Sequence, residues 1–373
     1  MSQLTLILLA AGSSSRFGFN VKKQWLRIDH KPLWQFVAEK LEQLHSFEKI
    51  IITSSSDDIE QMKNYANYTF IVGGNSRQES LINALSQVDT EHVIVSDIAR
   101  SCISEDFLQR ILSAKDEADC IVPYLNVTDT IVFDGKTINR DKVKRIQTPQ
   151  LSRTSTLKNA LQTDEEFTDE SSAIVSYGGT RFFILGEDDA HKLTYIEDLK
   201  KVPCLTSPSQ DILSGSGFDV HAFEDGGTMW LGGVEIDSKL SFKAHSDGDV
   251  AIHALIDALL GAAGMGDIGM MFPDSDKQYK GIDSKKLLCD VVSKINNYGF
   301  VIINTDITIA AQTPKIGKYK LAMRQTLANI LGIDSSRVNI KATTTEKLGF
   351  IGRSEGVGVI ANANLKYFNW EEI

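Results

Sequence analysis

The sequence predicts two unlike domains, an α/β domain followed by an α+β domain. Up to about residue 200, short apolar runs alternate with amphipathic stretches, which is typical of strands alternating with helices. A proline- and serine-containing segment near residue 208 then breaks the pattern, and the order of elements changes after it. The length of 373 residues suits two domains, which we place at residues 1–208 and 209–373.

The first domain is expected to contain a mostly parallel sheet covered on both faces. Its predicted strands are rich in Ile and Val, and its predicted helices carry apolar residues at helical spacing. The strands are residues 5–12, 49–55, 69–74, 92–97, 119–124 and 181–186, and the helices are residues 32–44, 77–88 and 105–118. Asp134-Gly135 lies between two β-branched runs, which predicts a hairpin projecting from the sheet.

The second domain, of about 160 residues, is long enough to fold alone. Strands are predicted at residues 214–223, 229–236, 301–312, 337–345 and 356–368, and helices at residues 247–264, 285–299 and 318–332. The order of these elements favours a sheet packed against helices.

Composition excludes several classes of protein. The formal charge is −10, from 39 basic and 49 acidic side chains, which argues against binding of nucleic acid. Apolar runs are too short for a membrane span, and we interpret the apolar start of the chain as a buried strand and not as a signal peptide. The four cysteines are widely scattered, so we expect reduced thiols, no thiolate metal cluster and a cytoplasmic location.

A glycine- and serine-rich loop follows the first predicted strand in LAAGSSSRFG, residues 9–18. Small residues at a strand end let backbone N–H groups approach phosphate oxygens, and Arg16 and Lys23 add positive charge. An ordinary turn with surface cations is the alternative. Asp97 lies just beyond another strand end, where it could bind Mg²⁺ among phosphates or simply cap a helix.

The motifs LAAGxxxRFG with KKQ, GGxxRxxS, SDIAR, DT and TPQ occur in an order that resembles 2-C-methyl-D-erythritol 4-phosphate cytidylyltransferase. The resemblance covers nearly all of the first ~200 residues. It implies a Rossmann-like nucleotidyltransferase fold, with CTP and methylerythritol phosphate as substrates and Mg²⁺ or Mn²⁺ as cofactor. This chain departs from the family's usual residues at Ser14, Asn75 and Ser96, where the family often has Gly, Asp and His.

The same resemblance implies roles for individual residues. Those for CTP are Arg16 and Lys23 at the α-phosphate, Ala10, Ala11, Gly12, Gly73, Gly74 and Ser80 as binding residues, and Asp97 as the metal ligand. Thr130, Arg140 and Lys192 would hold the methylerythritol phosphate, with Thr130 and Arg140 on the projecting hairpin.

A second constellation has the residue types of a metal site. Asp219 and His221 are two residues apart on a predicted strand, so both project from one face, and His253 lies on the apolar helix. An Asp/His/His set suits Zn²⁺ and leaves a fourth position for substrate or water. The alternative is an incidental Asp-x-His pair and a histidine satisfied within the core.

The motifs GxGFDVHAF, AHSDGDVAIHALIDALLGAAGMGDIG, FPDSD, AAQTPKI and KATTTEKLGFIGRSEGVG closely resemble 2-C-methyl-D-erythritol 2,4-cyclodiphosphate synthase, an α+β, ferredoxin-like enzyme. The resemblance implies that Asp219, His221 and His253 bind Zn²⁺ or another divalent cation, and that Glu346 helps to bind a second ion, Mg²⁺ or Mn²⁺. His245 and Thr344 would act near the diphosphate. The implied substrate-binding residues are Ser246, Asp267, Ile268, Gly269, Asp274, Ala311, Pro314, Lys315, Ile316, Ala342, Thr343, Glu346, Phe350 and Arg353.

Together the two resemblances predict a bifunctional enzyme of the non-mevalonate isoprenoid pathway. It would make CDP-methylerythritol, and it would cyclise CDP-methylerythritol 2-phosphate after a separate kinase has added the 2-phosphate. The families imply a transferase dimer and a cyclase trimer. Two alternatives stay open: a first domain that acts on another phosphorylated alcohol, and a scaffold in which one domain is inactive.

Overall fold

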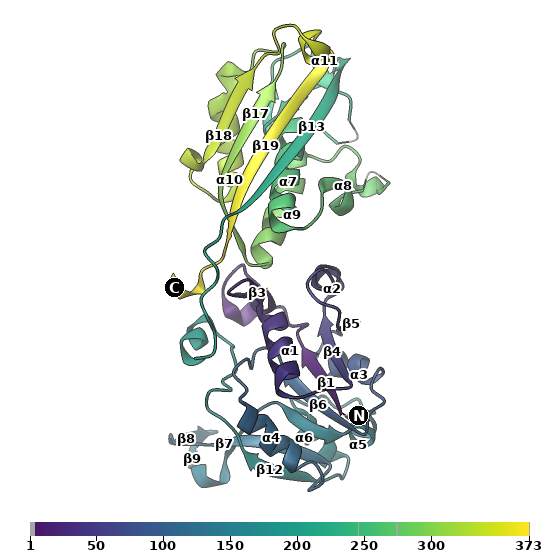
Figure 1. The fold of residues 1–373 in the computed structure, drawn as a ribbon, viewed down its shortest axis with the longest axis vertical. Coiled ribbons are helices and arrows are strands. Elements are labelled where there is room, and N and C mark those ends of the chain that lie inside the picture. Colours follow the sequence, from purple (N-terminus) through teal and green to yellow (C-terminus); the bar gives the residue numbers. More distant parts are fainter. Residues whose placement is uncertain (1–3, 245, 274, 373) are drawn as a thin grey trace. The chain divides into compact units, whose positions relative to one another are not determined.

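The computed structural model describes residues 4–244, 246–273 and 275–372, which form two compact units (Figure 1). The first unit ends at Ser207 and also takes in Trp370, whereas the second comprises Pro208–Asn369. Trp370 belongs with the first unit because its Nε1 donates a hydrogen bond to the backbone oxygen of Arg27 at 2.8 Å. We keep residue 208 as the proposed domain boundary, with this short terminal segment as an exception. In the described ranges, no helix combines the length and apolar character needed to cross a bilayer.

The first unit is built on an eight-stranded sheet with the order β10-β7-β11-β6-β1-β4-β5, and β12 pairs with β7. Its strands are β1 (Leu4–Leu9), β4 (Lys49–Ser54), β5 (Thr69–Val72), β6 (His92–Asp97), β7 (Cys120–Asn126), β10 (Lys144–Ile146), β11 (Gln150–Arg153) and β12 (Arg181–Leu185). The strands β6, β1, β4 and β5 run parallel, so their carboxyl ends meet at one edge. Every residue of β1 and β6 is buried, because these strands lie in the middle of the sheet between two layers of helices.

Helices surround this sheet and begin where the sequence supplies caps. They are α1 (Leu33–Leu44), α2 (Ser56–Met62), α3 (Arg77–Leu85), α4 (Glu105–Ser113), α5 (Thr154–Ala160) and α6 (Glu170–Ser176), with the short strands β2 (Arg27–Ile28) and β3 (Lys31–Pro32). Ser55, Ser76 and Ser104 each accept a hydrogen bond from the backbone N–H three residues later, which satisfies donors at the starts of α2, α3 and α4. The 3₁₀ turns η1 (Ser15–Phe17), η2 (Lys23–Trp25), η3 (Arg140–Lys142) and η4 (Ile196–Lys201) complete the unit.

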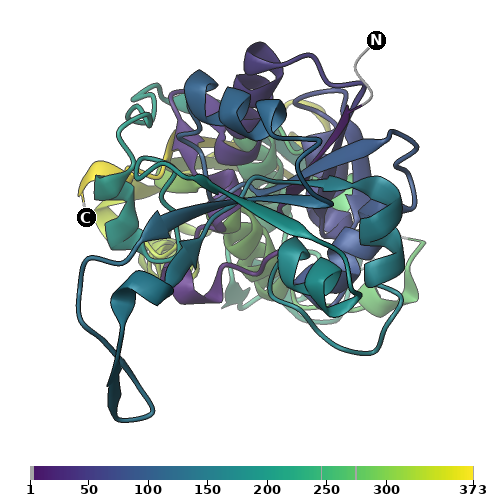
Figure 2. The same ribbon diagram turned by 90° about the horizontal axis from the view of Figure 1, so that it is seen from below.

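The predicted hairpin is confirmed as β8 (Ile131–Phe133) and β9 (Lys136–Ile138). Asp134 and Gly135 form its turn with φ angles of 49° and 71°, the left-handed conformations that Asp-Gly accommodates. Figure 2 shows the hairpin extending away from the sheet. Its tip exposes apolar side chains, since Val132 is 61% and Phe133 72% exposed.

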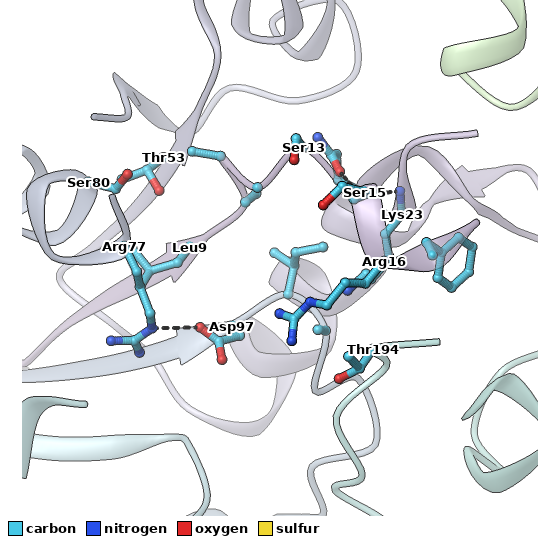
Figure 3. Close-up of a pocket in the computed structure, with 18 of the residues that line it drawn as sticks. Leu9, Ser13, Ser15, Arg16, Lys23, Thr53, Arg77, Ser80, Asp97 and Thr194 are labelled. Atoms are coloured by element: carbon cyan, nitrogen blue, oxygen red, sulfur yellow. Dashed lines mark hydrogen bonds and ion pairs between the residues drawn. The ribbon is translucent and has the colours of Figure 1, made fainter. Parts of the chain in front are cut away.

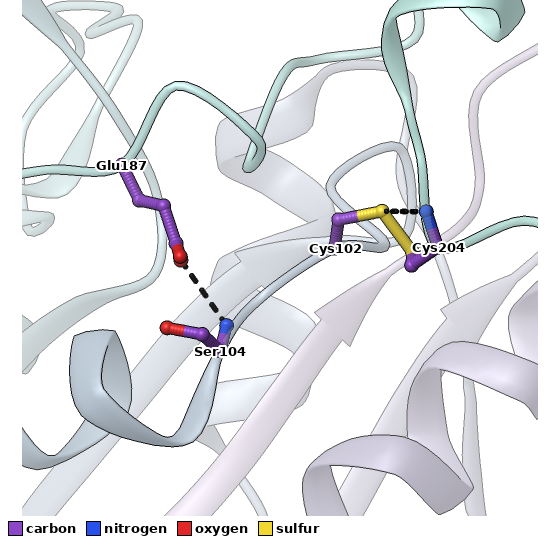
Figure 4. The surroundings of a disulfide bond; sticks show 4 residues. All are labelled: Cys102, Ser104, Glu187 and Cys204. Atoms are coloured by element: carbon purple, nitrogen blue, oxygen red, sulfur yellow. Dashed lines mark hydrogen bonds between the residues drawn. A yellow bond between two sulfur atoms is a disulfide. The ribbon is translucent and has the colours of Figure 1, made fainter.

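The expectation that all cysteines are reduced thiols is wrong for one pair. Cys102 and Cys204 form a disulfide with a Cα–Cα distance of 5.5 Å (Figure 4). They are 102 residues apart, so spacing along the chain gave no sign of the pairing. The fold brings the loop between β6 and α4 against the segment after η4. Cys120 and Cys289 are free.

The second unit contains a five-stranded sheet with the order β16-β13-β19-β17-β18. Its strands are β13 (Leu213–Asp225), β14 (Met229–Leu231), β15 (Val234–Ile236), β16 (Leu240–Phe242), β17 (Phe300–Ala310), β18 (Val338–Thr343) and β19 (Gly356–Tyr367), and its helices are α7 (Val250–Ala263), α8 (Ile268–Met271), α9 (Ser284–Asn297), α10 (Lys320–Leu331) and α11 (Gly349–Gly352). Helix α7 packs on β13 and β19, whereas Phe218, Val220 and Ile360 project from the same strands into solvent. The sheet therefore has one covered face and one exposed face that is partly apolar.

Two glycines let α7 lie directly on the backbone of β13. A Cβ atom built on Gly215 would lie 2.1 Å from the backbone oxygen of Ala258, and one on Gly217 would lie 2.0 Å from that of Ala254. Any larger residue would force the helix away from the strand. The alternation of the strand places Asp219 and His221 on this same face, next to the helix that carries His253.

Candidate active sites

The first unit has a cavity of about 450 Å³ at the carboxyl ends of β1, β4 and β6. This is the edge where open α/β sheets bind ligands. The cavity brings together nine residues expected from the sequence: Ala10, Ala11, Gly12, Arg16, Lys23, Gly74, Ser80, Asp97 and Lys192. Gly73 lies beside it, and its lack of a side chain is required because a Cβ there would be 2.5 Å from that of Ala11.

Asp97 lies between two cations. Lys192 Nζ is 2.6 Å from its Oδ2, and Arg77 Nε is 3.3 Å from its Oδ1 (Figure 3 shows the second pair). Burial acts to raise the pKa of Asp97, but the charges of Arg77 and Lys192 outweigh it and lower the pKa to about 2. The carboxylate is therefore ionised at neutral pH, as a ligand for a hard divalent cation must be.

Lys23 and Arg16 lie across the cavity from Asp97 (Figure 3). Lys23 Nζ donates a hydrogen bond to the backbone oxygen of Leu193 at 2.5 Å. Burial, together with the positive charges of Lys192 and Arg16, lowers the pKa of Lys23 to about 8. The lowered pKa means that the charged form of Lys23 is held at a cost in free energy, which the negative charge of a polyanionic ligand would offset.

Ser14 has a φ angle of 58° in the glycine loop, which explains why glycine suits this position. Its Oγ accepts a hydrogen bond from the backbone N–H of Lys23 at 2.9 Å and donates one to Gln24 Oε1 at 3.3 Å. Gln24 Nε2 in turn donates to the buried Asp58 at 3.1 Å. The hydroxyl therefore ties the loop to the turn that carries Lys23.

Thr130 and Arg140, the two hairpin residues expected at this site, lie outside the residues that line the described cavity. Arg140 Nη1 instead donates a hydrogen bond to the backbone oxygen of Thr128, within the base of the hairpin. The projection of the hairpin separates these two side chains from the cavity of their own chain.

In the second unit, Asp219, His221 and His253 form the one group of three or more His, Cys, Asp or Glu side chains, among those described, that could hold a metal ion. Asp219 Oδ2 lies 3.2 Å from His221 Nδ1 and 3.3 Å from His253 Nδ1. Burial acts to raise the pKa of Asp219, but its contacts with both histidines outweigh burial and hold the pKa below its ordinary range. His221 Nδ1 is buried and makes no hydrogen bond of its own, which fits a nitrogen that coordinates an ion.

A hydrogen bond at Nε2 of His253, the ring nitrogen that does not face Asp219, fixes the orientation of the ring. Ser284 Oγ donates its proton to Asp247 Oδ1 at 2.5 Å. The Ser284 hydroxyl oxygen is therefore an acceptor for His253 Nε2, which lies 3.0 Å away. With Nε2 donating to this hydroxyl, Nδ1 is the ring nitrogen available to coordinate an ion beside Asp219. Such support of a metal-binding histidine fixes both the tautomer and the ring orientation.

A cavity of about 560 Å³ surrounds the triad and is lined by Ser246, Ile268 and Gly269, as expected. Asp267 is not among the lining residues described. Its side chain accepts a hydrogen bond from Met270 N at 2.9 Å and caps α8. His245 and Asp274 lie outside the residues that the structure describes.

The remaining residues that the resemblance assigned to substrate or to the second ion lie at the same end of the sheet as the triad. Ala310, at the end of β17, and Val220, on β13, both pair with Gly358 of β19. Ala342 and Thr343 are the last two residues of β18, and the ends of β17 and β18 are followed by Ala311, Pro314, Lys315, Ile316, Thr344, Glu346, Phe350 and Arg353. None of these is among the described residues lining the cavity of the triad. Thr344 Oγ1 donates to Glu346 Oε1 at 3.0 Å, and Arg353 pairs with Glu355, so this group forms a separate surface within one chain.

The structure also adds residues that the sequence did not assign. Arg77 and Thr194 line the first cavity, and Lys243 and Asp257 line the second. The GGxxRxxS motif contains Arg77 and was a usable signal. Asp257 lies within the quoted motif AHSDGDVAIHALIDALLGAAGMGDIG, but no role was assigned to it, and no motif contained Thr194 or Lys243.

The fold and the two cavities define an enzyme with a nucleotidyltransferase domain and a metal-dependent cyclase domain. Residues 4–205 match the family model for 2-C-methyl-D-erythritol 4-phosphate cytidylyltransferase, and residues 212–366 match the YgbB family. The "Bifunctional enzyme IspD/IspF" of Sulfurimonas denitrificans is 69% identical over 99% of this chain and 96% of that protein. The solved bifunctional IspDF from Campylobacter jejuni is 49% identical, with a TM-score of 0.93 over 99% of this chain and 100% of that one.

The chain therefore belongs to the bifunctional IspD/IspF family. It carries the cytidylyltransferase and the cyclodiphosphate synthase of the methylerythritol phosphate pathway, as the sequence predicted.

Proposed function

We propose that the first cavity binds CTP with its triphosphate between Arg16 and Lys23 on one side and Asp97 on the other. An oxygen of the methylerythritol phosphate attacks the α-phosphorus and expels pyrophosphate. Arg16 and Lys23 stabilise the negative charge that develops on the transferring group. Mg²⁺ or Mn²⁺ on Asp97 would neutralise phosphate charge when bound, and Lys192 would orient the methylerythritol phosphate. The convergence of these four charged residues in one cavity carries the proposal.

In the second unit, we propose that Asp219, His221 and His253 bind Zn²⁺ or a similar divalent cation. The 2-phosphate of the substrate attacks the β-phosphorus and expels CMP. Because both groups are anionic, repulsion between them is a large part of the barrier. The triad's cation, and a second one at Glu346, would offset this repulsion when bound. Ser246, Ile268 and Gly269 enclose the substrate beside the triad.

Both sites are proposed to be completed by further copies of the chain. The hairpin carries Thr130 and Arg140 away from its own cavity and exposes Val132 and Phe133 at its tip, which supports a transferase dimer. The surface around Glu346 is separate from the triad, and the uncovered sheet face exposes Phe218 and Ile360, which supports a cyclase trimer.

The two reactions are not consecutive. CDP-methylerythritol lacks the 2-phosphate that acts as the nucleophile in ring closure, so a separate ATP-dependent kinase must act between them. We propose that the enzyme works in the cytoplasm, where CTP and that kinase would be available to it.

A pair of isosteric variants tests the assignment of the two sites. Asp97→Asn should lower pyrophosphate release from CTP and methylerythritol phosphate about a hundredfold, with CMP release from CDP-methylerythritol 2-phosphate unchanged. Asp219→Asn should do the reverse, so that each variant is the control for the other. Equal loss of both activities in either variant would contradict the assignment of one reaction to each unit.

A further inference from the structure

Glu170 is a buried carboxylate with a single charged partner. It is the first residue of α6, and its side chain is fully buried, with 0% of its surface exposed. Its Oε1 accepts a hydrogen bond from Arg77 Nη1 at 2.7 Å, whereas its Oε2 has no hydrogen-bond partner. Burial of a carboxylate is costly, and replacing such a pair by apolar residues is often neutral or stabilising. A role beyond stability is therefore the better explanation for its presence.

Arg77 connects this carboxylate to the nucleotide cavity. It is the first residue of α3, it lines the cavity, and its Nε lies 3.3 Å from Asp97 Oδ1. Glu170 is not among the described lining residues, so it reaches the site only through the guanidinium. Two ends of one planar group are thus held by two carboxylates, which fixes its orientation.

The charges at this position balance. Asp97 is in contact with Arg77 and with Lys192, so one carboxylate faces two cations. Burial raises the pKa of Glu170, and the charge of Arg77 acts to lower it; in its ionised form, Glu170 supplies the second negative charge and accepts a hydrogen bond from Arg77 Nη1. Without it, Asp97 alone would face both cations, and the one uncompensated positive charge would oppose binding of a divalent cation at Asp97.

The sheet fixes the position of Glu170. Gln150, on β11, donates from Nε2 to Asp169 Oδ2 at 3.0 Å and accepts from Ser171 N at 3.0 Å. These bonds hold the residues on either side of Glu170. The start of α6 is therefore attached to the central sheet and cannot shift independently of Asp97.

We propose that Glu170 is a positioning residue for cytidylyl transfer: it orients and neutralises Arg77, so that Asp97 is directed at the cation and triphosphate of bound CTP. This inference rests on the proposed role of Asp97 as a metal ligand. It assigns a function to a residue outside the cavity, which acts on the site through Arg77.

The test compares Glu170→Gln with Glu166→Gln in the full chain. The first variant removes the charge and keeps an acceptor for Arg77, whereas Glu166 is an exposed glutamate near the start of the same helix. Glu170→Gln should weaken Mn²⁺ binding in the presence of CTP about tenfold, measured by electron paramagnetic resonance. It should lower kcat for transfer by a similar factor with a smaller change in the KM for CTP. Glu166→Gln should change none of these values.

Arg77→Met separates positioning from simple structural support. Adding Glu170→Gln to Arg77→Met should cause no further loss of kcat, because the residue through which Glu170 acts is gone. Additive losses would overturn the proposal, as would unchanged Mn²⁺ binding in Glu170→Gln. If thermal unfolding shows that Glu170→Gln is not folded, Glu170→Asp is used in its place, because it keeps the charge and shortens the side chain. Its Mn²⁺ binding and its kcat are then compared with those of the wild type in the same way.

Asp97→Asn distinguishes failure of the proposed metal site from failure of the proposed role of Glu170. If Asp97→Asn leaves Mn²⁺ binding intact, the proposed metal site itself is wrong. If Asp97→Asn abolishes binding while Glu170→Gln has no effect, only the role of Glu170 is refuted.

Discussion

Replacing Lys23 should make the first unit more stable while it destroys cytidylyl transfer. The pKa of this lysine falls from an ordinary value of 10.5 to about 8, first because of burial and then because Lys192 and Arg16 lie nearby. That difference corresponds to about 3 kcal/mol of unfavourable free energy for the charged form in the folded unit. Lys23→Met keeps an apolar chain of similar length and removes the charge. It should therefore raise the free energy of unfolding at pH 7 by up to ~3 kcal/mol.

The same residue should give a pH dependence of stability with a defined sign. Below pH 8 the lysine is protonated in both folded and unfolded states, so the penalty is fully present. Between pH 8 and 10.5 the folded state has released the proton and the unfolded state has kept it, so stability rises with pH. Denaturant unfolding of the first unit should show this rise in the wild type, and the difference between wild type and Lys23→Met should shrink across that range.

Activity should change in the opposite direction. The charged lysine opposes negative charge on the transferring phosphoryl group, so Lys23→Met or Lys23→Ala should cost on the order of 3 kcal/mol of barrier, roughly a hundredfold in rate. The kcat/KM of the wild type should fall above pH 8 as Lys23 loses its proton. Cyclisation by the same protein is the internal control and should stay unchanged. A variant with full transfer activity, or one that is less stable at pH 7, would refute the reasoning.

Four further results are expected. His253→Ala should lose the metal of the second unit by elemental analysis and stop CMP release, and stoichiometric metal with normal turnover would contradict this. Purified protein given CTP, methylerythritol phosphate and divalent cations should accumulate CDP-methylerythritol, and cyclodiphosphate formed without kinase and ATP would overturn the order of chemistry. Cys204→Ser should destabilise the first unit by about 4 kcal/mol, because the disulfide closes a loop of about 100 residues; dithiothreitol should have the same effect on wild type and none on the variant. Ser14→Gly relieves a positive φ but removes the hydroxyl that holds Lys23, so transfer should slow about fivefold with no fall in melting temperature, whereas equal rates would show that the hydroxyl has no such role.

The sequence was most informative where neighbours along the chain determine structure. The Asp134-Gly135 turn, the strand-end placement of Asp97 and the shared face of Asp219 and His221 all follow from short-range periodicity, and the structure has each of them. The placement of His253 beside that pair came from resemblance, since spacing alone cannot show which helix packs on which strand.

Contacts between distant segments were not predictable. Arg77 and Glu170 are 93 residues apart, and Cys102 and Cys204 are 102 apart, so nothing in local pattern joins them. Motif residues can also have a purely structural task. Asp249, within AHSDGDVAIH, is buried and accepts hydrogen bonds from the backbone N–H groups of Gly232, Gly233, Ala251 and Ile252. Sequence alone cannot distinguish an acid of this kind from a metal ligand.

The glycines that bring α7 onto β13 set the dimensions of the proposed metal site without contacting it. A methyl group at Gly217 would overlap the helix backbone, and the helix would have to retreat by more than the ~0.2 Å that ligand distances in a metal site tolerate. On this face of β13, Gly215 and Gly217 set the distance between the strand and the helix, and Asp219 and His221 supply ligand atoms at that distance. Since contact between two backbones fixes that spacing, the triad is assembled when the unit folds. The ligand atoms are therefore preorganised before an ion binds. The free energy of coordination then contributes to affinity and is not consumed in ordering the chain.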